Sequence, residues 1–429
     1  YDGIHRLKKV SFKESSGSAA VILDEYTYPA PSGGKWYKNH TRHLDGSTTA
    51  VTQYTYDYAG RETKRVNPDG GQIITAYNTN GTKASVTDAR NHTTYYKYNG
   101  MNRLIKTWTP IESGLYMYSE FVYDKAGRVT QEKRGKDTIA YPNTPASDRL
   151  IVTYYDYYAS GKLKYKKVGS LTKEYYWYDN DGNISKTYRY MTGTQIMVTE
   201  YVNNHLNKPV TVKTHVKKGN IYPNDFDNLT DSVILTTTNT YDKNGNLKTV
   251  TEPERSAEYF YDSMDRLTGT TIYSDKDEND NTADITTSKT YDTMGNVSTE
   301  TDAKGNVTEY TYDKRNFLTK VKQTVDVGGT PTNIYTAYDY DRAGRKIREV
   351  SPKNYISGQS TTNMNRTEYI YDKMDRMKIK KEIYIPYGET TFITTVTRAC
   401  KYDPNGNKIK ELDGEGFGTA SGTTDDEKI

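Results

Sequence analysis

The sequence predicts an all-β protein in which short antiparallel strands follow one another as stacked hairpins. Composition is the first observation, since 43 of the 429 residues are Tyr, against 7 Phe and 3 Trp. Leu, Ile, Val and Phe together stay below the about 20% that warns of disorder. Disorder is nevertheless disfavoured, because 59 basic residues nearly balance 55 acidic ones and aromatic residues are abundant. Tyr and Thr suit a pleated, half-buried surface, so we predict a thin wall or extended array and not a thick globule.

A seven-residue motif that recurs along the whole chain is the second observation. It begins with Tyr-Asp and, in its clearest copies, ends with an apolar residue, as in YDKAGRV from Tyr123 and YDKNGNL from Tyr241. Worn copies begin at Tyr77 and Tyr157. Several successive copies lie 20 or 21 residues apart, as from Tyr56 to Tyr77 and from Tyr77 to Tyr98, and the spacing is longer elsewhere. Self-similarity at a period of about 20 to 50 residues is the mark of a repeat architecture.

The fifth position of the motif is the third observation, because every clear copy has Gly, Asp, Asn or His there. These are the residues that tolerate a positive φ, so this position is predicted to be left-handed. The Asp or Asn at position two can bind the backbone two residues further on, which favours entry into a turn. A type I turn followed by a left-handed residue is a common hairpin connection. The motif therefore predicts a hairpin corner, in which the Tyr ends one strand and the seventh residue begins the next.

The predicted corner residues have a structural role, and they are Tyr1, Asp2, Tyr56, Asp57, Gly60, Arg61, Tyr98, Asn102, Tyr123, Asp124, Gly127, Arg128, Tyr178, Asp179, Gly182, Tyr241, Asp242, Gly245, Tyr261, Asp262, Asp265, Tyr291, Asp292, Gly295, Tyr312, Asp313, Tyr340, Asp341, Gly344, Tyr371, Asp372, Asp375, Tyr402, Asp403 and Gly406. His5 and Asn316 stand at the fifth position of two further copies.

A second type of turn is predicted between the motifs. Its examples are NPDGG (67–71), DARNH (88–92), DAKGN (302–306) and DGEGF (413–417). Each repeat then consists of strand, corner, strand and turn, with strands of about five or six residues.

Tyrosines also occur two residues apart before many corners, as at Tyr54 and Tyr56 or Tyr369 and Tyr371. Residues at this spacing share one face of a strand. Neighbouring strands would then place Tyr beside Tyr, and such aromatic pairs stabilise a sheet by roughly 0.2–1 kcal/mol each.

The motif, with its DAxGN turns, resembles the YD or Rhs repeat family. Members include Rhs toxins, cocoon proteins of toxin complexes, wall-associated protein A of Gram-positive bacteria and teneurins. The resemblance covers essentially the whole chain. It implies a long sheet that spirals into a hollow β-shell, which in the toxins encloses a C-terminal toxic domain. We therefore expect residues 1–429 to form a single repeat array, a fragment of a longer shell, with a low-complexity end at 412–429.

Four long inserts interrupt the repeats and are predicted to be enlarged turns at one edge of the sheet. They span 134–148, 217–231, 274–284 and 351–365. Inserts of this kind are also places where a binding function could lie.

Residues that could support metal binding are few. Asp275, Asp277 and Asn279 have the spacing of a calcium loop, but Asp280 and Thr286 stand where such a loop has Gly and Glu. A solvated acidic hairpin is therefore expected. His40 and His43 lack a third ligand, so a surface turn is the simpler interpretation. We predict no metal site and no cofactor.

Catalytic patterns are also missing from the sequence. It contains no G-x-S-x-G elbow, and Cys400, the single cysteine, has no evident His partner. Acidic pairs are numerous but fall in the corners, where turn geometry accounts for them, although a glycosidase-like pair stays open. We predict that the chain is not an enzyme.

Two functions from different classes remain. The first is a structural shell segment of an Rhs-type polymorphic toxin, which encloses and helps deliver a C-terminal toxin in bacterial competition. Its partners would be the remaining repeats and the toxin cargo of the same polypeptide. The alternative is a cell-surface adhesion module that binds glycans or wall polymers through Tyr faces or through the Lys-rich stretches 164–167 and 378–381. The balanced charge gives no sign of nucleic-acid binding, and no apolar stretch is long enough to span a membrane.

The expected location follows from the same resemblance. A single cysteine excludes an intrachain disulfide, which suits a cytosolic protein or a Gram-positive surface protein. We expect a secreted or cell-wall-associated protein from a Gram-positive bacterium.

Overall fold

The computed structural model describes residues 1–13, 17–112, 114–138, 140–143, 145, 150–169, 172–191, 195–218, 233–274, 284–419 and 425–429. Its described residues form 31 strands, which are β1 (Lys9–Phe12), β2 (Val21–Thr27), β3 (Trp36–His43), β4 (Thr49–Tyr56), β5 (Glu62–Val66), β6 (Gln72–Tyr77), β7 (Lys83–Thr87), β8 (Thr93–Tyr98), β9 (Leu104–Glu112), β10 (Leu115–Tyr123), β11 (Val129–Asp137), β12 (Ile151–Tyr157), β13 (Leu163–Val168), β14 (Thr172–Tyr178), β15 (Ile184–Tyr190), β16 (Gln195–Asn203), β17 (Pro209–Lys218), β18 (Val233–Tyr241), β19 (Leu247–Thr251), β20 (Arg255–Tyr261), β21 (Leu267–Ser274), β22 (Ile285–Tyr291), β23 (Val297–Thr301), β24 (Val307–Tyr312), β25 (Leu318–Val327), β26 (Thr330–Tyr340), β27 (Lys346–Val350), β28 (Arg366–Tyr371), β29 (Met377–Tyr384), β30 (Ile393–Tyr402) and β31 (Lys408–Asp413). The short helices are η3 (Pro352–Asn354), η4 (Thr361–Asn363), α1 (Gly414–Thr419) and α2 (Asp425–Lys428). The all-β prediction is confirmed.

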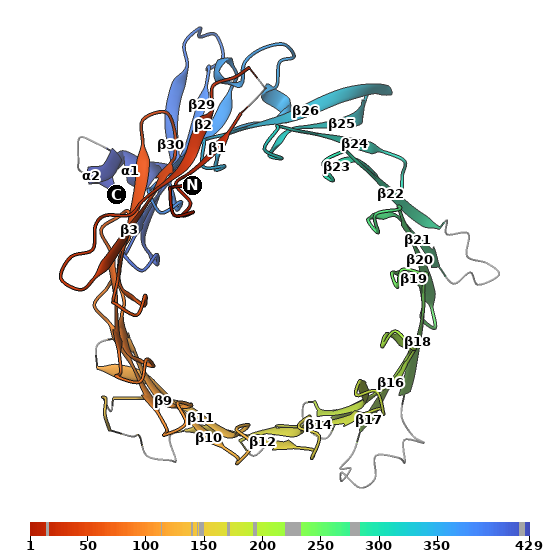
Figure 1. Ribbon diagram of the computed structural model, residues 1–429. Coiled ribbons are helices and arrows are strands. Elements are labelled where there is room, and N and C mark those ends of the chain that lie inside the picture. Colours follow the sequence, from red (N-terminus) through yellow and green to blue (C-terminus); the bar gives the residue numbers. More distant parts are fainter. Residues whose placement is uncertain are drawn as a thin grey trace. The chain divides into compact units, whose positions relative to one another are not determined.

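Strand pairing is antiparallel and follows the order of the chain. Each strand from β1 to β7 pairs with the next. The same holds from β8 to β22 and from β24 to β31. In Figure 1 the colours accordingly change step by step from strand to strand. A hairpin-by-hairpin array needs only short connections, which is what the closely spaced turn residues supply.

The chain divides into two compact units. The first contains residues 1–94, 291–299 and 306–429, and the second contains 95–290 and 300–305. Each unit is built from the same consecutive hairpins.

Alternation along the strands has the predicted period of two. In β6 and β24, exposed and half-buried residues alternate from the first residue to the last. Strand length varies more than predicted, from 4 residues in β1 to 11 in β26. One reason is that β25 and β26 continue into a tight two-residue hairpin, where Gly328 and Gly329 both have positive φ.

Fully buried side chains form small local clusters. In the second unit, Tyr188, Ile196 and Val198 pack together on β15 and β16. In the first unit, Ala337, Val350 and Met364 form a cluster beside η4. The insert 351–365 is therefore more than an enlarged turn, because it supplies both 3-10 helices and a buried Met.

The DGEGF turn prediction is wrong. After β31 the backbone continues into helix α1, and the carboxylate of Asp413 accepts a hydrogen bond from the amide of Gly416 (2.7 Å). Phe417 and Ile429 pack with Ile379 and Ala399. Burial of these apolar side chains favours the helix over a turn, so part of the predicted low-complexity end is ordered against β29 and β30.

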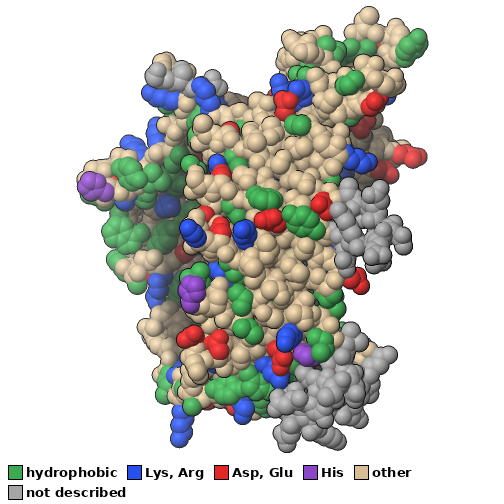
Figure 2. Space-filling view, turned by 90° about the vertical axis from the view of Figure 1, so that its right-hand side faces the viewer, with side chains coloured by type: hydrophobic (Ala, Val, Ile, Leu, Met, Phe, Trp, Pro, Cys, Tyr) green, Lys and Arg blue, Asp and Glu red, His purple; other side chains and the backbone are tan. Residues whose placement is uncertain are grey.

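The surface is mixed in character. On the face shown in Figure 2, hydrophobic, basic and acidic side chains are interspersed and do not form one large patch. None of the described helices has the length and hydropathy needed to cross a membrane.

Candidate functional site

All the motif corners share one backbone geometry. In the Tyr56 corner, the amide of Asp57 donates to the carbonyl of Arg61, and the amide of Gly60 donates to the carbonyl of Asp57, both at 3.0 Å. Tyr56 lies opposite Glu62, with a register shift beside it. These bonds define a three-residue hairpin loop with a bulge at its left-handed residue. The fifth residue has positive φ at His5, Gly60, Asn102, Gly127, Gly182, Gly245, Asp265, Gly295, Asn316, Gly344, Asp375 and Gly406.

The side chain at position two, Asp in most corners and Asn99 in the Tyr98 corner, closes the corner from inside. In the same corner, Asp57 Oδ1 accepts the amides of Ala59 and Arg61, each at 3.0 Å. Its other oxygen accepts Nε of Arg61 at 2.8 Å. Equivalent Nε–carboxylate bonds of 2.6 to 2.8 Å occur in the corners of Arg6, Arg61, Arg128, Arg266, Arg345 and Arg376. The carboxylate thus satisfies backbone donors that the hairpin ladder leaves open.

The cation at position six also reaches the next corner. The Arg61 guanidinium lies 4.5 Å from the ring centre of Tyr77, the tyrosine that starts the following motif. The same contact, at 4.1 to 5.8 Å, joins Arg6 to Tyr28, Arg61 to Tyr77, Arg103 to Tyr123, Arg128 to Tyr157, Lys162 to Tyr178, Lys208 to Tyr241, Arg345 to Tyr371 and Arg376 to Tyr402. A cation over an aromatic face is attracted to the ring. Where we predicted Tyr beside Tyr, the motif ring is therefore also paired with a cation.

The tyrosine hydroxyl completes the connection. Tyr261 donates to the carbonyl of Leu247, the seventh residue of the preceding corner, at 2.9 Å. The same bond, at 2.6 to 3.0 Å, joins Tyr28 to Leu7, Tyr77 to Glu62, Tyr123 to Leu104, Tyr157 to Val129, Tyr241 to Pro209, Tyr371 to Lys346 and Tyr402 to Met377. These donors and acceptors lie where two paired strands reach the corner edge and the backbone ladder ends. The tyrosine hydroxyl therefore extends the hydrogen bonding between two strands by one bond.

Corners with Asn at position six use a different contact. The Asn246 amide donates to Asp242 in its own corner (3.0 Å) and to Asp265, the fifth residue of the next corner (2.7 Å). Asn183 and Asn296 bind the next fifth residue, Asn207 and Asn316, in the same way. An Asn side chain is too short to lie over the next ring, so a side-chain oxygen at the next fifth position replaces that contact.

Where position six is a cation, the next fifth residue is usually Gly. A Cβ atom at Gly127 would lie 2.5 Å from Nη2 of Arg103 in the preceding corner. The cation therefore occupies the space that a side chain would need. Asp375 is an exception, because its carboxylate accepts the guanidinium of Arg345 at 3.2 Å. The fifth position is thus coupled to the corner before it.

Electrostatics in the corners favour the ionised carboxylate. Hydrogen bonds from the side chain and backbone of Arg61 hold the pKa of Asp57 below its usual value. The bonds from Arg266 do the same to the pKa of Asp262. The amides of Ser47 and Thr48 lower the pKa of Asp45 to about 2. Each carboxylate is kept charged by the donors that define its turn.

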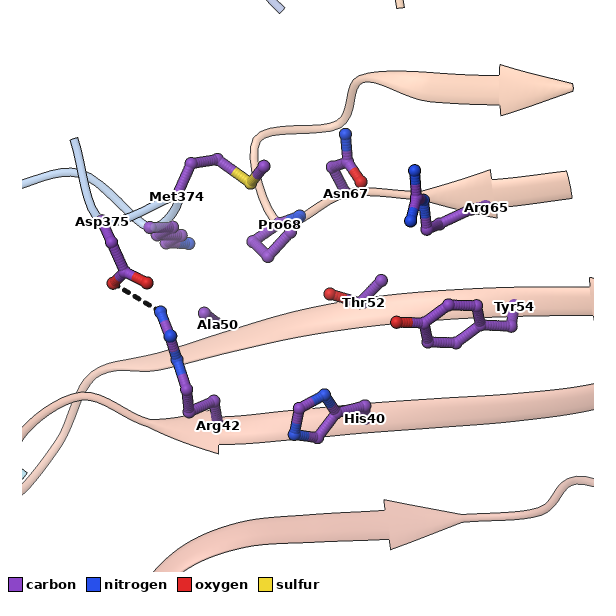
Figure 3. A pocket seen from close by; sticks show the side chains of 11 residues that line it. His40, Arg42, Ala50, Thr52, Tyr54, Arg65, Asn67, Pro68, Met374 and Asp375 are labelled. Carbon is purple, nitrogen blue, oxygen red and sulfur yellow. Dashed lines mark hydrogen bonds and ion pairs between the residues drawn. The ribbon is translucent and has the colours of Figure 1, made fainter. Parts of the chain in front are cut away.

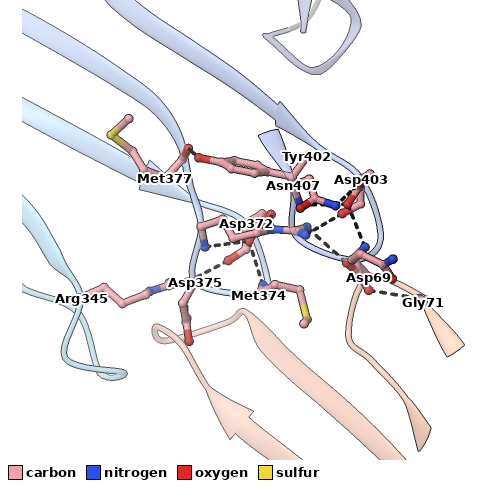
Figure 4. Close-up of polar contacts among 12 residues, drawn as sticks. Asp69, Gly71, Arg345, Asp372, Met374, Asp375, Met377, Tyr402, Asp403 and Asn407 are labelled. Atoms are coloured by element: carbon pink, nitrogen blue, oxygen red, sulfur yellow. Dashed lines mark hydrogen bonds and ion pairs between the residues drawn. The ribbon is translucent and has the colours of Figure 1, made fainter. Parts of the chain in front are cut away.

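Within the first unit, turns of the N-terminal strands meet corners of the C-terminal strands. Figure 4 shows Asp69 beside the corners of Asp372 and Asp403. Arg376 Nη2 lies 3.2 Å from Asp69 Oδ2. We call this pair, together with Arg90–Asp403 (3.4 Å) and Asn405–Asp88 (2.7 Å), the edge contacts. They use side chains that the motif already places, so one set of corner residues also connects segments far apart in sequence.

Part of the chain matches a known family of repeats. The family model described as RHS Repeat matches residues 241–278 and 291–331. These two segments are RHS repeats. The same corner geometry recurs in the motif copies outside the matched residues, as far as Gly406.

Solved structures with low sequence identity are also similar to this chain. The crystal structure of TcdB2-TccC3-Cdc42 has 12% identity and a TM-score of 0.42, covering 89% of this chain and 27% of that chain. TcdB2-TccC3 without its hypervariable C-terminal region has 13% identity and a TM-score of 0.43, covering 96% and 25%. A Tc holotoxin pore of Photorhabdus luminescens has 13% identity and a TM-score of 0.39, covering 88% and 26%. This chain thus spans about a quarter of the length of these chains. No curated protein matches it.

One corner was not predicted from the sequence. Between β16 and β17, the amide of Asn204 donates to the carbonyl of Lys208, and Asn207 has a φ of 60°. Asn203 stands where the motif has Tyr, so a search for Tyr-Asp could not find it. The signal that remained was an Asn at the fifth position, followed by Lys.

Two of the turns predicted between motifs are not a second type. In NPDGG, the amide of Asn67 donates to the carbonyl of Gly71, and Gly70 has a φ of 87°. In DARNH, Asp88 and His92 make the same bond and Asn91 has a φ of 63°. Both turns repeat the corner geometry without the Tyr, because the backbone requirement for a left-handed residue is the same at either end of a hairpin.

The candidate metal residues have other environments. His40 and His43 lie in strand β3, where residues three apart point to opposite faces. His40 Nε2 contacts Asp24 Oδ1 at 2.6 Å. In the part of the chain that the structure describes, no three His, Cys, Asp or Glu side chains form a group that could hold a metal ion.

The remaining candidate residues are the single cysteine and those with the spacing of a calcium loop. Cys400 is buried in β30. Asp275, Asp277, Asn279 and Asp280 lie outside the described residues.

Proposed function

We propose that this chain is a wall segment of an RHS shell that encloses a toxin and helps deliver it in bacterial competition. Its partners would be the remaining repeats and the toxin cargo of the same polypeptide. The proposal includes a secreted or wall-associated location in a Gram-positive bacterium. It assigns enclosure, not catalysis, to these residues.

The observation that carries the proposal is the large accessible surface area of the chain. The chain exposes 26477 Å² of surface. A compact monomer of 48.9 kDa would expose about 17,000 Å². The excess arises because strands pair edge to edge and few of the described side chains are fully buried. A sheet of this kind has a large surface and a small buried interior, as a wall requires.

Solution scattering and protease protection test the proposal. The radius of gyration of the purified chain should clearly exceed the about 22 Å expected for a compact globule of this length. In the complete polypeptide, the segment that carries the toxin should resist protease until the repeats are unfolded. A compact radius, or a cargo cleaved as quickly as the isolated toxin, would contradict enclosure.

Adhesion to glycans is the competing proposal, and the corner geometry weakens it. The motif tyrosines that would stack on sugars donate their hydroxyls to the backbone and lie against cations. A Tyr387 side chain is fully exposed in the turn after β29, but a single exposed ring does not make a sugar platform. Binding of this chain to cell-wall polysaccharide would reverse the preference.

A further inference from the structure

A cavity of about 220 Å³ lies in the first unit, between β3, β4 and β5 on one side and the corner after β28 on the other. Figure 3 shows His40 and Arg42 on β3, and Thr52 and Tyr54 on β4. Met374 and Asp375 approach from the facing corner. The cavity is thus assembled from two segments more than 300 residues apart in sequence.

The charges around this cavity do not balance. Its single carboxylate, Asp375, contacts Arg42 at 2.5 Å and also accepts Nη1 of Arg345 at 3.2 Å. Lys373 forms no ion pair with the described residues. Among the described residues, the single ion pair of Arg65 is the one with Glu62, at 3.9 Å from its Nε. Two cations therefore line the cavity beyond those that Asp375 neutralises.

Arg65 also has an unused donor. Its Nε is buried, and no acceptor in the described residues binds it. A buried donor without a partner is costly, so this N–H needs an acceptor from outside the described residues, either water or a ligand. Thr52 and Tyr54 lie two residues apart on β4 and share a face. Their hydroxyls add two further donors beside the two cations.

We propose that this cavity binds a small oxyanion group, a phosphate or a carboxylate. A guanidinium offers parallel N–H donors that match either group. Arg65 would be the main ligand and Lys373 would supply charge from the facing corner. Because the two come from different segments, a bound anion would join the N-terminal strands to the C-terminal corner. The proposal concerns a ligand of the wall and does not rest on enclosure of a toxin.

Isothermal titration calorimetry at constant ionic strength tests the proposal. The probes are inorganic phosphate, glycerol phosphate, acetate and, as a neutral control, glucose. Direct binding is measured because phosphate also stabilises proteins through exclusion from their surface. Arg65→Gln and Lys373→Gln should each weaken anion binding about tenfold, the size expected for one charge-assisted hydrogen bond. Lys64→Gln is the matched control, because Lys64 is the neighbour of Arg65 on β5 and faces the opposite side.

Each outcome decides the matter. Saturable binding of phosphate or acetate that Arg65→Gln and Lys373→Gln weaken and Lys64→Gln leaves unchanged supports the site. Phosphate alone identifies a tetrahedral anion, glycerol phosphate as well shows that the group can belong to a larger molecule, and acetate alone identifies a carboxylate. No saturable heat, equal loss in Lys64→Gln, or equal binding of glucose would overturn the proposal. Circular dichroism of the variants separates loss of binding from loss of folding.

Discussion

The hydroxyl group of each motif tyrosine connects two corners by a hydrogen bond. It binds a carbonyl at a point where the antiparallel ladder has already ended, so no backbone amide takes its place. A net hydrogen bond of this kind stabilises a protein by about 0.5–1.5 kcal/mol.

Tyr261→Phe tests this contribution. The change removes the bond to Leu247 and keeps the ring, so we expect a loss of about 1 kcal/mol in the free energy of unfolding. Urea denaturation followed by circular dichroism measures it. Tyr387→Phe is the control, because that side chain is fully exposed. Equal effects of the two changes would refute the structural role of the hydroxyl.

The fifth position gives a second test, at Gly60 and Gly127. Gly60→Val should cost more than about 1 kcal/mol, because a β-branched residue is a poor left-handed conformer. Gly60→Asn should cost less, since open space surrounds Gly60. Gly127→Asn should cost more than Gly60→Asn, because its Cβ meets the Arg103 guanidinium. Urea midpoints for the three variants decide, and equal costs for Val and Asn at Gly60 would contradict the left-handed assignment.

The corner carboxylates predict a dependence on pH. The folded pKa of Asp57 and of Asp262 lies below the unfolded value of about 3.9. Their stabilisation is therefore complete above that value and is lost as the pH falls through the lowered pKa. The urea concentration at the unfolding midpoint should stay constant from pH 7 to pH 5 and should decrease when the pH is lowered beyond about 4. Asp262→Asn should make that fall shallower, and an unchanged acid profile would refute the assignment.

At the residue scale, the sequence predicted the backbone more fully than the side-chain contacts. A left-handed fifth residue can be predicted because it depends only on local sterics. The partner of Tyr261 could not, because Leu247 lies in another corner and contributes a carbonyl that every residue has. Asn207 shows the converse, since its corner forms without the Tyr-Asp pair that defined the search.

At the scale of the element, consecutive corners are matched and not interchangeable. Asn at position six is followed by Asn or Asp at the next fifth position, as in Asn246 and Asp265. Arg103 is followed by Gly127, whose missing Cβ leaves room for the guanidinium. The residue at the fifth position of a corner therefore depends on the residue at position six of the corner before it.

A double-mutant cycle tests that match. Asn246→Ala and Asp265→Gly, singly and together, should show a coupling of about 0.5–1.5 kcal/mol in the free energy of unfolding. Asp265→Asn is the control, because it keeps an acceptor oxygen and tolerates positive φ. It should change stability by less than about 0.5 kcal/mol. Additive effects of the first two changes would show that the corners are independent.

The sequence was less informative about the elements between corners. It predicted a different turn for 67–71 and 88–92 because these lack Tyr, although backbone geometry does not require Tyr. It also predicted a turn at DGEGF. Helix α1 forms there because Phe417 is buried against residues of β29 and β30, a tertiary effect that local pattern cannot show.

At the scale of the whole molecule, the edge contacts extend these local rules over long separations within the first unit. Arg376 binds Asp372 in its own corner and Asp69 in a turn of the N-terminal strands. Single exposed ion pairs contribute little, so we expect the edge contacts to act as a set.

Hydrogen exchange tests this connection. Arg376→Gln should speed exchange in its own corner and also in the turn 67–71, because both lose a partner. Arg266→Gln is the control, since Arg266 occupies the same motif position in the second unit. It should affect its own corner and leave 67–71 unchanged. A purely local effect of Arg376→Gln would show that the edge contacts contribute nothing.

The reach of the position-six side chain has a consequence for how such chains grow. Apart from the edge contacts, each Arg or Asn at position six contacts its own corner and the next one, so the free energy of the array is close to a sum of nearest-neighbour terms. The strands between corners can then lengthen, as β25 and β26 do, while the coupling stays intact. A duplicated segment is compatible with its surroundings when its first corner accepts the side chain that precedes it and its last corner presents a side chain that the next one accepts. Whether a tandem duplication is compatible with the array thus depends on the residues at positions five and six of the motif.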